Sequence, residues 1–158
     1  MSLLVTEPQR TEAKSRLIGI RLAMLTLRMR DNWSKLFGDH ETAVIALAIV
    51  VIMSERLVRS GLQPGLETLA VPMPTDDLAK CNVSSIAAAT GLNRETTRRK
   101  VDQLVRLGLV VKEKGAIQLR PGATQQAIAT EAVKIQLDEL RRAANDFLRM
   151  GVLELKEP

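Results

Sequence analysis

The sequence is poor in aromatic, cysteine and histidine side chains, and each shortage removes a class of structure or chemistry. Only Trp33, Phe37 and Phe147 are aromatic, so a folded core has to be aliphatic. The single Cys81 excludes a disulfide within the chain and fits a reducing compartment. Together with the one histidine, His40, it is too little for a metal site built from thiolates and imidazoles.

Sequence signatures of catalysis and of membrane insertion are missing as well. Neither a GxGxxG motif nor a GxxxxGK motif followed by Ser or Thr occurs, and Asp76 and Asp77 lack a neighbouring base or nucleophile. The longest apolar run, Ala43 to Met53, is well short of the roughly 20 residues that span a bilayer. The first twenty residues carry charges instead of the apolar segment of a secretory signal. We therefore predict a soluble, cytoplasmic protein that is not an enzyme, needs no cofactor or metal and has no membrane partner.

The 158 residues are enough for one domain with a core of its own, or for a small domain with helical extensions. Their patterning predicts an N-terminal helix in residues 1–38, a central domain in residues 39–122 and a C-terminal helix in residues 123–158. The first eight residues are expected to be a loose end, with Pro8 suited to a first helical turn.

Two long amphipathic helices are predicted at the two ends of the chain, over residues 9–37 and about 123–150. Their apolar positions follow helical spacing: Leu17, Ile18, Leu22, Leu25, Met29, Trp33, Leu36 and Phe37 in the first, and Ala127, Ile128, Ala132, Ile135, Leu140, Ala144, Phe147 and Leu148 in the second. An apolar stripe of this length outside the central domain needs a cover. A second copy of the chain is the simplest one, so both helices are predicted to mediate dimerisation.

The central domain begins with a helix that Asp39 can cap. Its middle, Ala43 to Met53, is apolar on nearly all sides, which predicts a helix enclosed by other elements. An inserted loop follows over residues 62–77, rich in proline and glycine, and is interpreted either as a partner-contacting arm or as a lid over a small pocket. One helical turn over residues 76–80 and a short strand over residues 81–83 are expected after it.

The stretch from Val83 to Arg120 predicts two helices joined by a tight turn, followed by a hairpin. Ser84 has the side-chain oxygen of an N-cap for a short first helix, which Gly91 ends. Asn93 is the N-cap of the second helix, residues 93–107. The apolar stripe of this second helix consists of Thr97, Val101, Leu104 and Leu107.

Basic side chains gather on the opposite face of the second helix and on the hairpin. The helix face carries Arg94, Glu95, Arg98, Arg99 and Asp102, with Thr96 at its front edge. The hairpin pairs residues 109–112 with residues 116–119 and carries Lys112, Lys114 and Arg120. Eight basic and three acidic residues give Val83 to Arg120 a net charge of +5, which equals that of the whole chain, so the remainder is neutral. Such a concentration of charge is typical of a surface that binds phosphates.

A family resemblance rests on the run SSIAAATGLNRETTRRKVDQLVRLGLVVKEKGAIQLRPG, which covers about a quarter of the chain. It resembles the winged helix-turn-helix of bacterial transcriptional regulators, particularly the GntR and IclR types. The resemblance implies DNA contacts for Arg94, Thr96, Arg98 and Arg99. Two positions depart from it, because Thr97 and Lys100 stand where relatives often have apolar residues, and neither flank resembles the ligand-binding domains of those families.

A recognition helix in the major groove gives each of these side chains a predicted role. Arg can bind guanine with two hydrogen bonds, whereas hydroxyls and other cations hold phosphates. We assign Arg94 and Arg98 to base edges, Arg99 and Thr96 to the DNA backbone, and Lys112, Lys114 and Arg120 to wing contacts with phosphate or the minor groove.

Plainer interpretations stand beside these roles. The charges from Arg94 to Lys100 also suit a solvated helix face, Thr96 also suits a capping role, and Glu95 is interpreted as stabilising the helix start in preference to reading cytosine. His40 is interpreted as a surface or packing residue. Cys81 is read as an inert buried thiol or a redox sensor, and Trp33 as an interface anchor or the wall of a ligand pocket.

The sequence therefore predicts a mainly α fold with a small β-wing, in which a winged helix-turn-helix is flanked by long N- and C-terminal helices. The predicted function is a sequence-specific, double-stranded DNA-binding transcriptional regulator that acts as a homodimer. The alternative is a winged-helix protein–protein interaction module without specific DNA binding. A third interpretation is a regulator that senses a small-molecule effector between the loop of residues 62–77 and the flanking helices.

Overall fold

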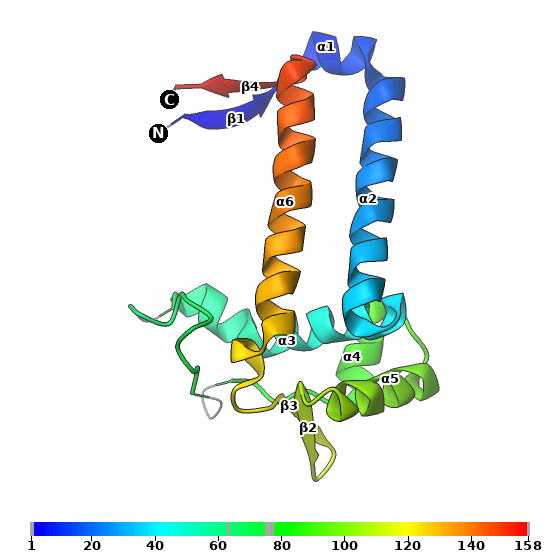
Figure 1. Ribbon diagram of the computed structural model, residues 1–158, viewed down its shortest axis with the longest axis vertical. Helices are drawn as coiled ribbons and strands as arrows, with labels where there is room; N and C mark the ends of the chain where they lie inside the picture. The colour runs from blue at the N-terminus through cyan, green and yellow to red at the C-terminus, as the bar shows by residue number, and fades with distance from the viewer. Residues whose placement is uncertain (1, 63, 75–77, 158) are drawn as a thin grey trace. The chain divides into compact units, whose positions relative to one another are not determined.

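The computed structural model describes residues 2–62, 64–74 and 78–157, and its contacts divide the chain into two compact units (Figure 1). Unit 1 comprises Met1–Asn32 and Val133–Pro158, and unit 2 comprises Trp33–Ala132. The fold is mainly helical with two small antiparallel sheets. In chain order its elements are β1 (Leu3–Thr6), α1 (Pro8–Ala13), α2 (Ser15–Phe37), α3 (His40–Ser60), α4 (Val83–Thr90), α5 (Arg94–Arg106), β2 (Val110–Glu113), β3 (Ala116–Leu119), the 3-10 helix η2 (Ala123–Gln125), α6 (Ala127–Arg149) and β4 (Leu153–Lys156).

Across the described residues, no single helix combines the length and the apolar character that crossing a membrane requires. Only the bent pair Ser15–Phe37 and His40–Glu55 meets both criteria when its two helices are taken together.

Unit 2 is built around an aliphatic core, as predicted. Eight of its apolar side chains expose at most 1% of their surface: Ala43, Ile45, Ile49 and Met53 of α3, Ile86 of α4, Val101 and Leu104 of α5, and Ile117 of β3. Phe37 joins this cluster, and Trp33 packs against it while remaining partly exposed. The apolar faces of three helices and one strand therefore meet in a single place, which fixes how α5 is turned.

The helices of unit 2 begin and end where capping chemistry allows. The Asp39 carboxylate accepts hydrogen bonds from the Thr42 N–H at 2.9 Å and from the Thr42 hydroxyl at 2.8 Å, as expected of an N-cap. The predicted cap at Ser84 is wrong. Helix α4 starts earlier, at Val83, because Asn82 and Ser85 cap each other reciprocally and satisfy two backbone N–H groups. The left-handed Gly91 then ends α4, as predicted.

Helix α5 follows its predicted pattern except at its last turn. Asn93 is its N-cap and accepts from the Thr96 N–H at 2.7 Å. Thr97, Val101 and Leu104 are fully buried, but Leu107 is 42% exposed and does not continue the buried stripe. The reason is that α5 ends at Arg106, and the chain then turns at Gly108 so that Leu109 takes the buried place.

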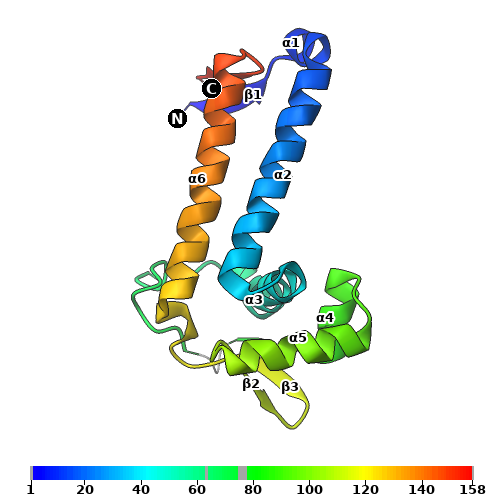
Figure 2. The ribbon, with the colours of Figure 1, turned by 45° about the vertical axis from the view of Figure 1, so that its right-hand side comes forward.

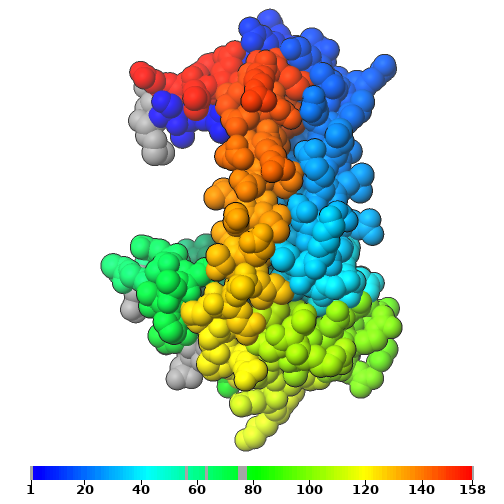
Figure 3. All heavy atoms as spheres, viewed as in Figure 1, coloured from blue at the N-terminus to red at the C-terminus, as the bar shows by residue number. Residues whose placement is uncertain are grey.

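The predicted hairpin is present as β2 and β3, but its first strand lies one residue later than the predicted 109–112: Val110 is opposite Leu119, and Glu113 belongs to the strand and is opposite Ala116. Lys114 and Gly115 both have positive φ, the backbone signature of a tight two-residue turn that suits twisted strands. Cys81 forms an isolated β-bridge with Ile117, because its N–H and C=O both bond to that residue. The predicted strand over residues 81–83 is otherwise wrong, since Val83 lies in α4. The hairpin projects from the rest of unit 2 (Figures 2 and 3).

Two further expectations for unit 2 have to be corrected. Helix α3 is not enclosed on nearly all sides, because Val50, Val51 and Val58 are exposed and only its opposite face enters the core. The helical turn expected over residues 76–80 is absent from residues 78–80, and Asp76 and Asp77 lie outside the described residues. The described part of the inserted loop has neither helix nor strand, as predicted.

Unit 1 joins the beginning and the end of the described chain. The first residues are not a loose end: β1 pairs antiparallel with β4, from Leu3 opposite Lys156 to Thr6 opposite Leu153. The residues around β1 give no sign of this pairing, because β4 lies about 150 residues further along the sequence. Below the strands, α2 and α6 run side by side in both ribbon views (Figures 1 and 2).

The two long helices of the sequence prediction are each interrupted near their N-terminal ends. The first is split at Lys14 into α1 and α2, and Pro8 occupies the first turn of α1 as expected. The Lys14 Nζ donates to the Met150 carbonyl at 2.7 Å, a contact that becomes available at the break. The second begins with the 3-10 turn η2, and α6 proper starts at Ala127. Leu17, Leu22 and Leu140, predicted to share the covered stripes, are exposed.

Replacing Leu104 by Ala tests the core of unit 2. Because Leu104 is fully buried, the change should lower the free energy of unfolding by about 2–5 kcal/mol. Leu107→Ala, the same substitution at an exposed site just beyond the end of α5, should cost within about 0.5 kcal/mol. Urea denaturation followed by circular dichroism measures both, and equal losses would contradict the packing described.

Candidate nucleic-acid interface

The turn between α4 and α5 holds the N-terminal end of α5 firmly. The Gly91 N–H donates to the Ala87 carbonyl at 2.9 Å, which closes α4 in a left-handed cap. Leu92 packs partly buried against the core, and Asn93 caps the next helix. A capped helix end anchored by an apolar contact has little freedom, so the backbone of the first turns of α5 is held in place.

Helix α5 separates its buried and exposed faces cleanly. Thr97 is fully buried, and its hydroxyl donates to the Asn93 carbonyl at 2.9 Å, so this polar side chain is satisfied inside the core. On the other face Arg94, Arg98 and Arg99 are exposed. Within the described part of the chain, Arg94 and Arg99 form no ion pair. Two guanidinium groups are therefore available to an outside ligand.

Arg98 has a partner on its own helix. Its Nη2 lies 2.9 Å from Glu95 Oε1, and both side chains are exposed. The hydrogen bond and charge of Arg98 lower the pKa of Glu95, so this carboxylate is ionised at neutral pH. Glu95 thus holds the Arg98 guanidinium against the helix surface. Its negative charge in the first turn of α5 also interacts favourably with the helix dipole.

Thr96 lies beside the arginines and does not act as the cap that was one interpretation of it. Asn93 caps the helix, and Thr96 contributes its backbone N–H to that cap. In the described residues its hydroxyl has no hydrogen-bond partner, which leaves it available for an external acceptor.

The three cations predicted for the hairpin region lie in different surroundings. Lys112 Nζ lies 2.7 Å from Asp102 Oδ1, an ion pair that joins β2 to the exposed side of α5. Lys114 is exposed in the turn at the tip. Arg120 is exposed just after β3, beside Gly108. Among the described residues neither Lys114 nor Arg120 has an ion-pair partner. The structure thus places Lys112 against α5 and leaves Lys114 and Arg120 outward.

Among the basic residues between Arg94 and Lys100, only Lys100 turns toward the interior of the protein. Its Nζ lies 2.7 Å from Asp39 Oδ1 and 3.5 Å from Glu41 Oε2, and its side chain is mostly buried. Gln103 joins the same junction: its Nε2 donates to the Phe37 carbonyl at 3.3 Å, and its Oε1 lies 3.1 Å from the Thr42 hydroxyl oxygen, sharing with Asp39 the one proton of that hydroxyl. This polar junction between α3 and α5 was not predicted from the sequence. Two features of the sequence pointed to it: Lys100 at a position expected to be apolar, and Asp39 as a helix cap.

Within the junction, Asp39 is the residue whose pKa is clearly shifted. Partial burial acts to raise its pKa, but the Lys100 ammonium and the hydrogen bonds from Thr42 outweigh it and lower the pKa from 3.8 to about 2. Asp39 is therefore a charged cap whose ion pair ties the start of α3 to α5.

Other residues singled out from the sequence lie away from this face. Burial raises the pKa of the Cys81 thiol from 9.0 to about 11, and its Sγ lies 3.4 Å from the Ile117 carbonyl oxygen, which favours an inert thiol over a redox sensor. In the described structure, buried Trp33 Nε1 and His40 Nδ1 have no hydrogen-bond partner. The described residues contain no group of three or more His, Cys, Asp or Glu side chains that could hold a metal ion.

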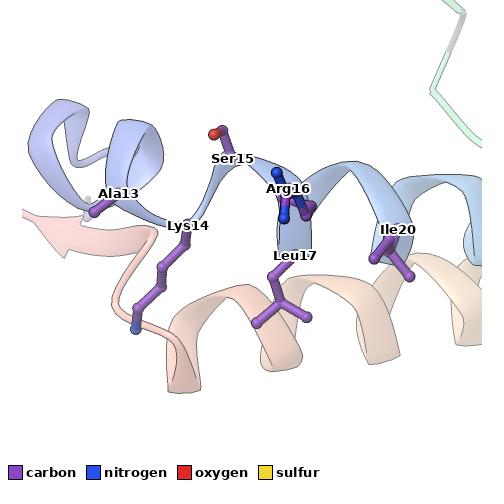
Figure 4. Close-up of a pocket in the computed structure, with 6 residues that line it drawn as sticks. All are labelled: Ala13, Lys14, Ser15, Arg16, Leu17 and Ile20. Carbon is purple, nitrogen blue, oxygen red and sulfur yellow. The ribbon is translucent and has the colours of Figure 1, made fainter.

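The described part of the inserted loop and a depression in unit 1 are separate features. Gln125 Nε2 donates to the carbonyls of Leu69 and Val71 at 2.7 and 3.2 Å, which ties the described part of the loop to η2. A shallow depression of about 640 Å³ lies instead in unit 1, at the start of α2 (Figure 4). It is lined by Ala13, Lys14, Ser15, Arg16, Leu17 and Ile20, none of which belongs to the loop.

Comparisons of the chain with protein-family models, with curated proteins and with solved structures give no match.

An Asp39→Asn variant tests the polar junction. Asparagine still caps a helix but carries no charge, so the variant should be less stable than the wild type at pH 7. The folded-state pKa of Asp39, about 2, lies below its ordinary value of 3.8, so its stabilising effect is complete above that value and is lost as pH falls through 2. The difference in unfolding free energy should therefore shrink between about pH 4 and pH 2. Asp138→Asn, which removes an exposed carboxylate paired with Arg141, is the control; a pH-independent difference for Asp39→Asn would contradict the assignment.

Proposed function

We propose that unit 2 is a winged helix-turn-helix domain and that the protein is a sequence-specific regulator of transcription. It binds double-stranded DNA as a homodimer in the cytoplasm and is not an enzyme. The order of elements supports this, since three helices are followed by a two-stranded hairpin, with α4 and α5 joined by a short glycine-containing turn.

One observation carries the proposal: α5 buries Thr97, Val101 and Leu104 fully while Arg94, Arg98 and Arg99 stand exposed on the other side. Had the guanidinium groups pointed into the core, no groove of DNA could reach them. A helix with cations near its N-terminal end and a fixed apolar back is the shape that enters the major groove, which is wide enough for one helix.

The exposed groups fall into roles that their surroundings suit. Arg94 and Arg98 are assigned to base edges, where a guanidinium can bind guanine O6 and N7 together. Arg99 and the unbonded Thr96 hydroxyl are assigned to phosphates. In the hairpin, Lys114 and Arg120 are assigned to phosphate or minor-groove contacts, and Lys112, already paired with Asp102, to a weaker one.

Carboxylates on the same face also shape the interaction. Glu95 and Asp102 neutralise Arg98 and Lys112 in the structure without DNA, so phosphates or base edges have to displace these ion pairs or share their cations. Both pairs are exposed to solvent, which screens them, so their loss is readily offset by charge-assisted bonds to DNA.

The same mixture of charges favours a second candidate, a winged-helix module that binds an acidic protein without specific DNA binding. Because two cations of this face already have acidic partners, its positive field is weaker than the residue count alone implies. The two candidates differ in one respect that can be measured, which is selection of a duplex sequence by the purified protein.

Replacing Arg98 by Ala tests base recognition. Duplexes selected from a random pool define the preferred sequence, and Arg98→Ala should weaken its binding by about 1–3 kcal/mol and flatten the preference at one or two positions. Arg59→Ala removes an exposed arginine paired with Glu55 on α3 and serves as the matched control, with unchanged binding expected. If an Arg94/Arg98 double alanine variant bound like the wild type across a salt titration, DNA recognition by α5 would be excluded.

Replacing Lys114 by Ala tests the hairpin separately. A lysine that only binds phosphate contributes equally to every sequence, so affinity should fall alike for preferred and random duplexes. The slope of log K against log salt concentration should become smaller by about 1, because one fewer counterion is released. A loss confined to the preferred duplex would mean that the hairpin reads bases instead.

A further inference from the structure

Arg98 differs from the other two arginines in the first half of α5. Its guanidinium is paired along its own helix, with Nη2 donating to Glu95 Oε1 at 2.9 Å. Within the described residues Arg94 and Arg99 form no ion pair and have no such restraint. One of the three arginines assigned to DNA is therefore held in a defined direction by a neighbouring side chain.

The contact between Glu95 and Arg98 follows from their spacing. The two residues are three positions apart in α5, so their side chains leave the same face of the helix about one turn apart. The same spacing brings Asp138 within 3.3 Å of Arg141 on α6. A shorter carboxylate can therefore make this contact as well.

Carboxylates stand on both sides of Arg98 along the helix. Asp102 follows it by four positions, one turn further on. The hydrogen bond to Glu95, and then the charges of Glu95 and Asp102, raise the pKa of the Arg98 guanidinium. Asp102 is itself paired with Lys112. A phosphate that binds Arg98 has to approach both carboxylates, and repulsion between like charges opposes this.

The pairing leaves Arg98 able to bind a base. A guanidinium has five N–H groups, of which Nη2 carries two. One hydrogen bond from Nη2 to Glu95 leaves the others, including a parallel pair that fits O6 and N7 of one guanine. These acceptors are uncharged, so guanine adds no negative charge beside Glu95. A base edge therefore tolerates the Glu95 carboxylate better than a phosphate does.

We infer that Glu95 is a positioning residue that directs Arg98 to guanine and disfavours its binding to phosphates. The inference rests on the proposed function and names what α5 selects, a duplex with guanine facing Arg98. It differs from the two roles weighed from the sequence, stabilising the helix start and reading cytosine, because here Glu95 acts through Arg98.

Two effects of the Glu95 carboxylate increase specificity. A guanidinium that is already restrained loses less conformational entropy when it binds guanine. A negative charge beside it weakens binding wherever Arg98 meets only phosphates. The first effect favours the correct duplex and the second disfavours all others.

Glu95→Gln tests the inference, because glutamine keeps the size of the side chain and removes its charge. The duplex selected by the wild type is compared with the same duplex changed at the guanine whose preference Arg98→Ala removes. Discrimination between the two should fall about three- to tenfold. Random duplexes should bind more tightly, with a slope of log K against log salt concentration steeper by about 1, because Arg98 then binds a phosphate. Glu95→Asp should retain most of the discrimination.

The same substitution in an Arg98→Ala background separates positioning from other roles. Glu95→Gln should then leave the preference at every position of the duplex unchanged. A further loss of preference would mean that Glu95 contacts a base itself. An equal change for all duplexes, with an unchanged salt slope, would mean that it only stabilises the helix, and either result overturns the inference. Glu131→Gln, at an exposed site on α6, is the matched control and should change neither quantity.

A measurement without DNA tests the restraint directly. In nuclear magnetic resonance relaxation of the wild type, the order parameter of the Arg98 Nε–H should exceed that of Arg94, and Glu95→Gln should lower it toward the Arg94 value. Equal order parameters in the wild type would overturn the inference. A wild type that selects no duplex sequence would remove the proposed function and this inference together. A selective wild type whose preference survives Glu95→Gln would remove this inference alone.

Discussion

The burial of one face of α5 is the constraint on which the rest of unit 2 depends. Thr97, Val101 and Leu104 are held against α3 and α4, so the helix cannot rotate without exposing aliphatic surface to water. The face of the helix that carries the exposed arginines is therefore oriented by groups on its far side. Specific recognition needs such a rigid support, because a side chain that wanders by an ångström loses directional hydrogen bonds.

A polar junction reinforces this apolar packing. Lys100, Asp39, Thr42 and Gln103 connect the first turn of α3 with the middle of α5 through ion pairs and hydrogen bonds. The junction also lowers the positive charge that α5 presents to solvent, since a lysine paired with two carboxylates adds little to the electrostatic potential at the surface. Net charge along a segment is thus an upper limit on what a ligand meets, and the orientation of each side chain decides the rest.

Local chemistry made much of unit 2 predictable from the sequence. The cap at Asn93, the left-handed Gly91 and the Lys114–Gly115 turn are each determined by two to four neighbouring residues. What could not be predicted depends on distant partners. Nothing near Leu3 indicates its pairing with Lys156, and nothing near Leu140 shows that it faces outward while Glu139 is buried against Arg28. The exposure of the α5 arginines was predictable because composition and helical period agree there, whereas the attachment of Lys112 to Asp102 required the fold.

The pairing of β1 with β4 has a consequence for the order of events during synthesis. Unit 2 is a continuous segment, so it can fold as soon as it leaves the ribosome. Unit 1 is discontinuous, and its sheet closes only after Leu153–Lys156 have been made. The N-terminal strand and α2 must wait, with their apolar side chains unprotected, while more than a hundred residues are added. The sheet of unit 1, and every contact that depends on it, therefore forms only after Leu153–Lys156 have left the ribosome, later than the core of unit 2.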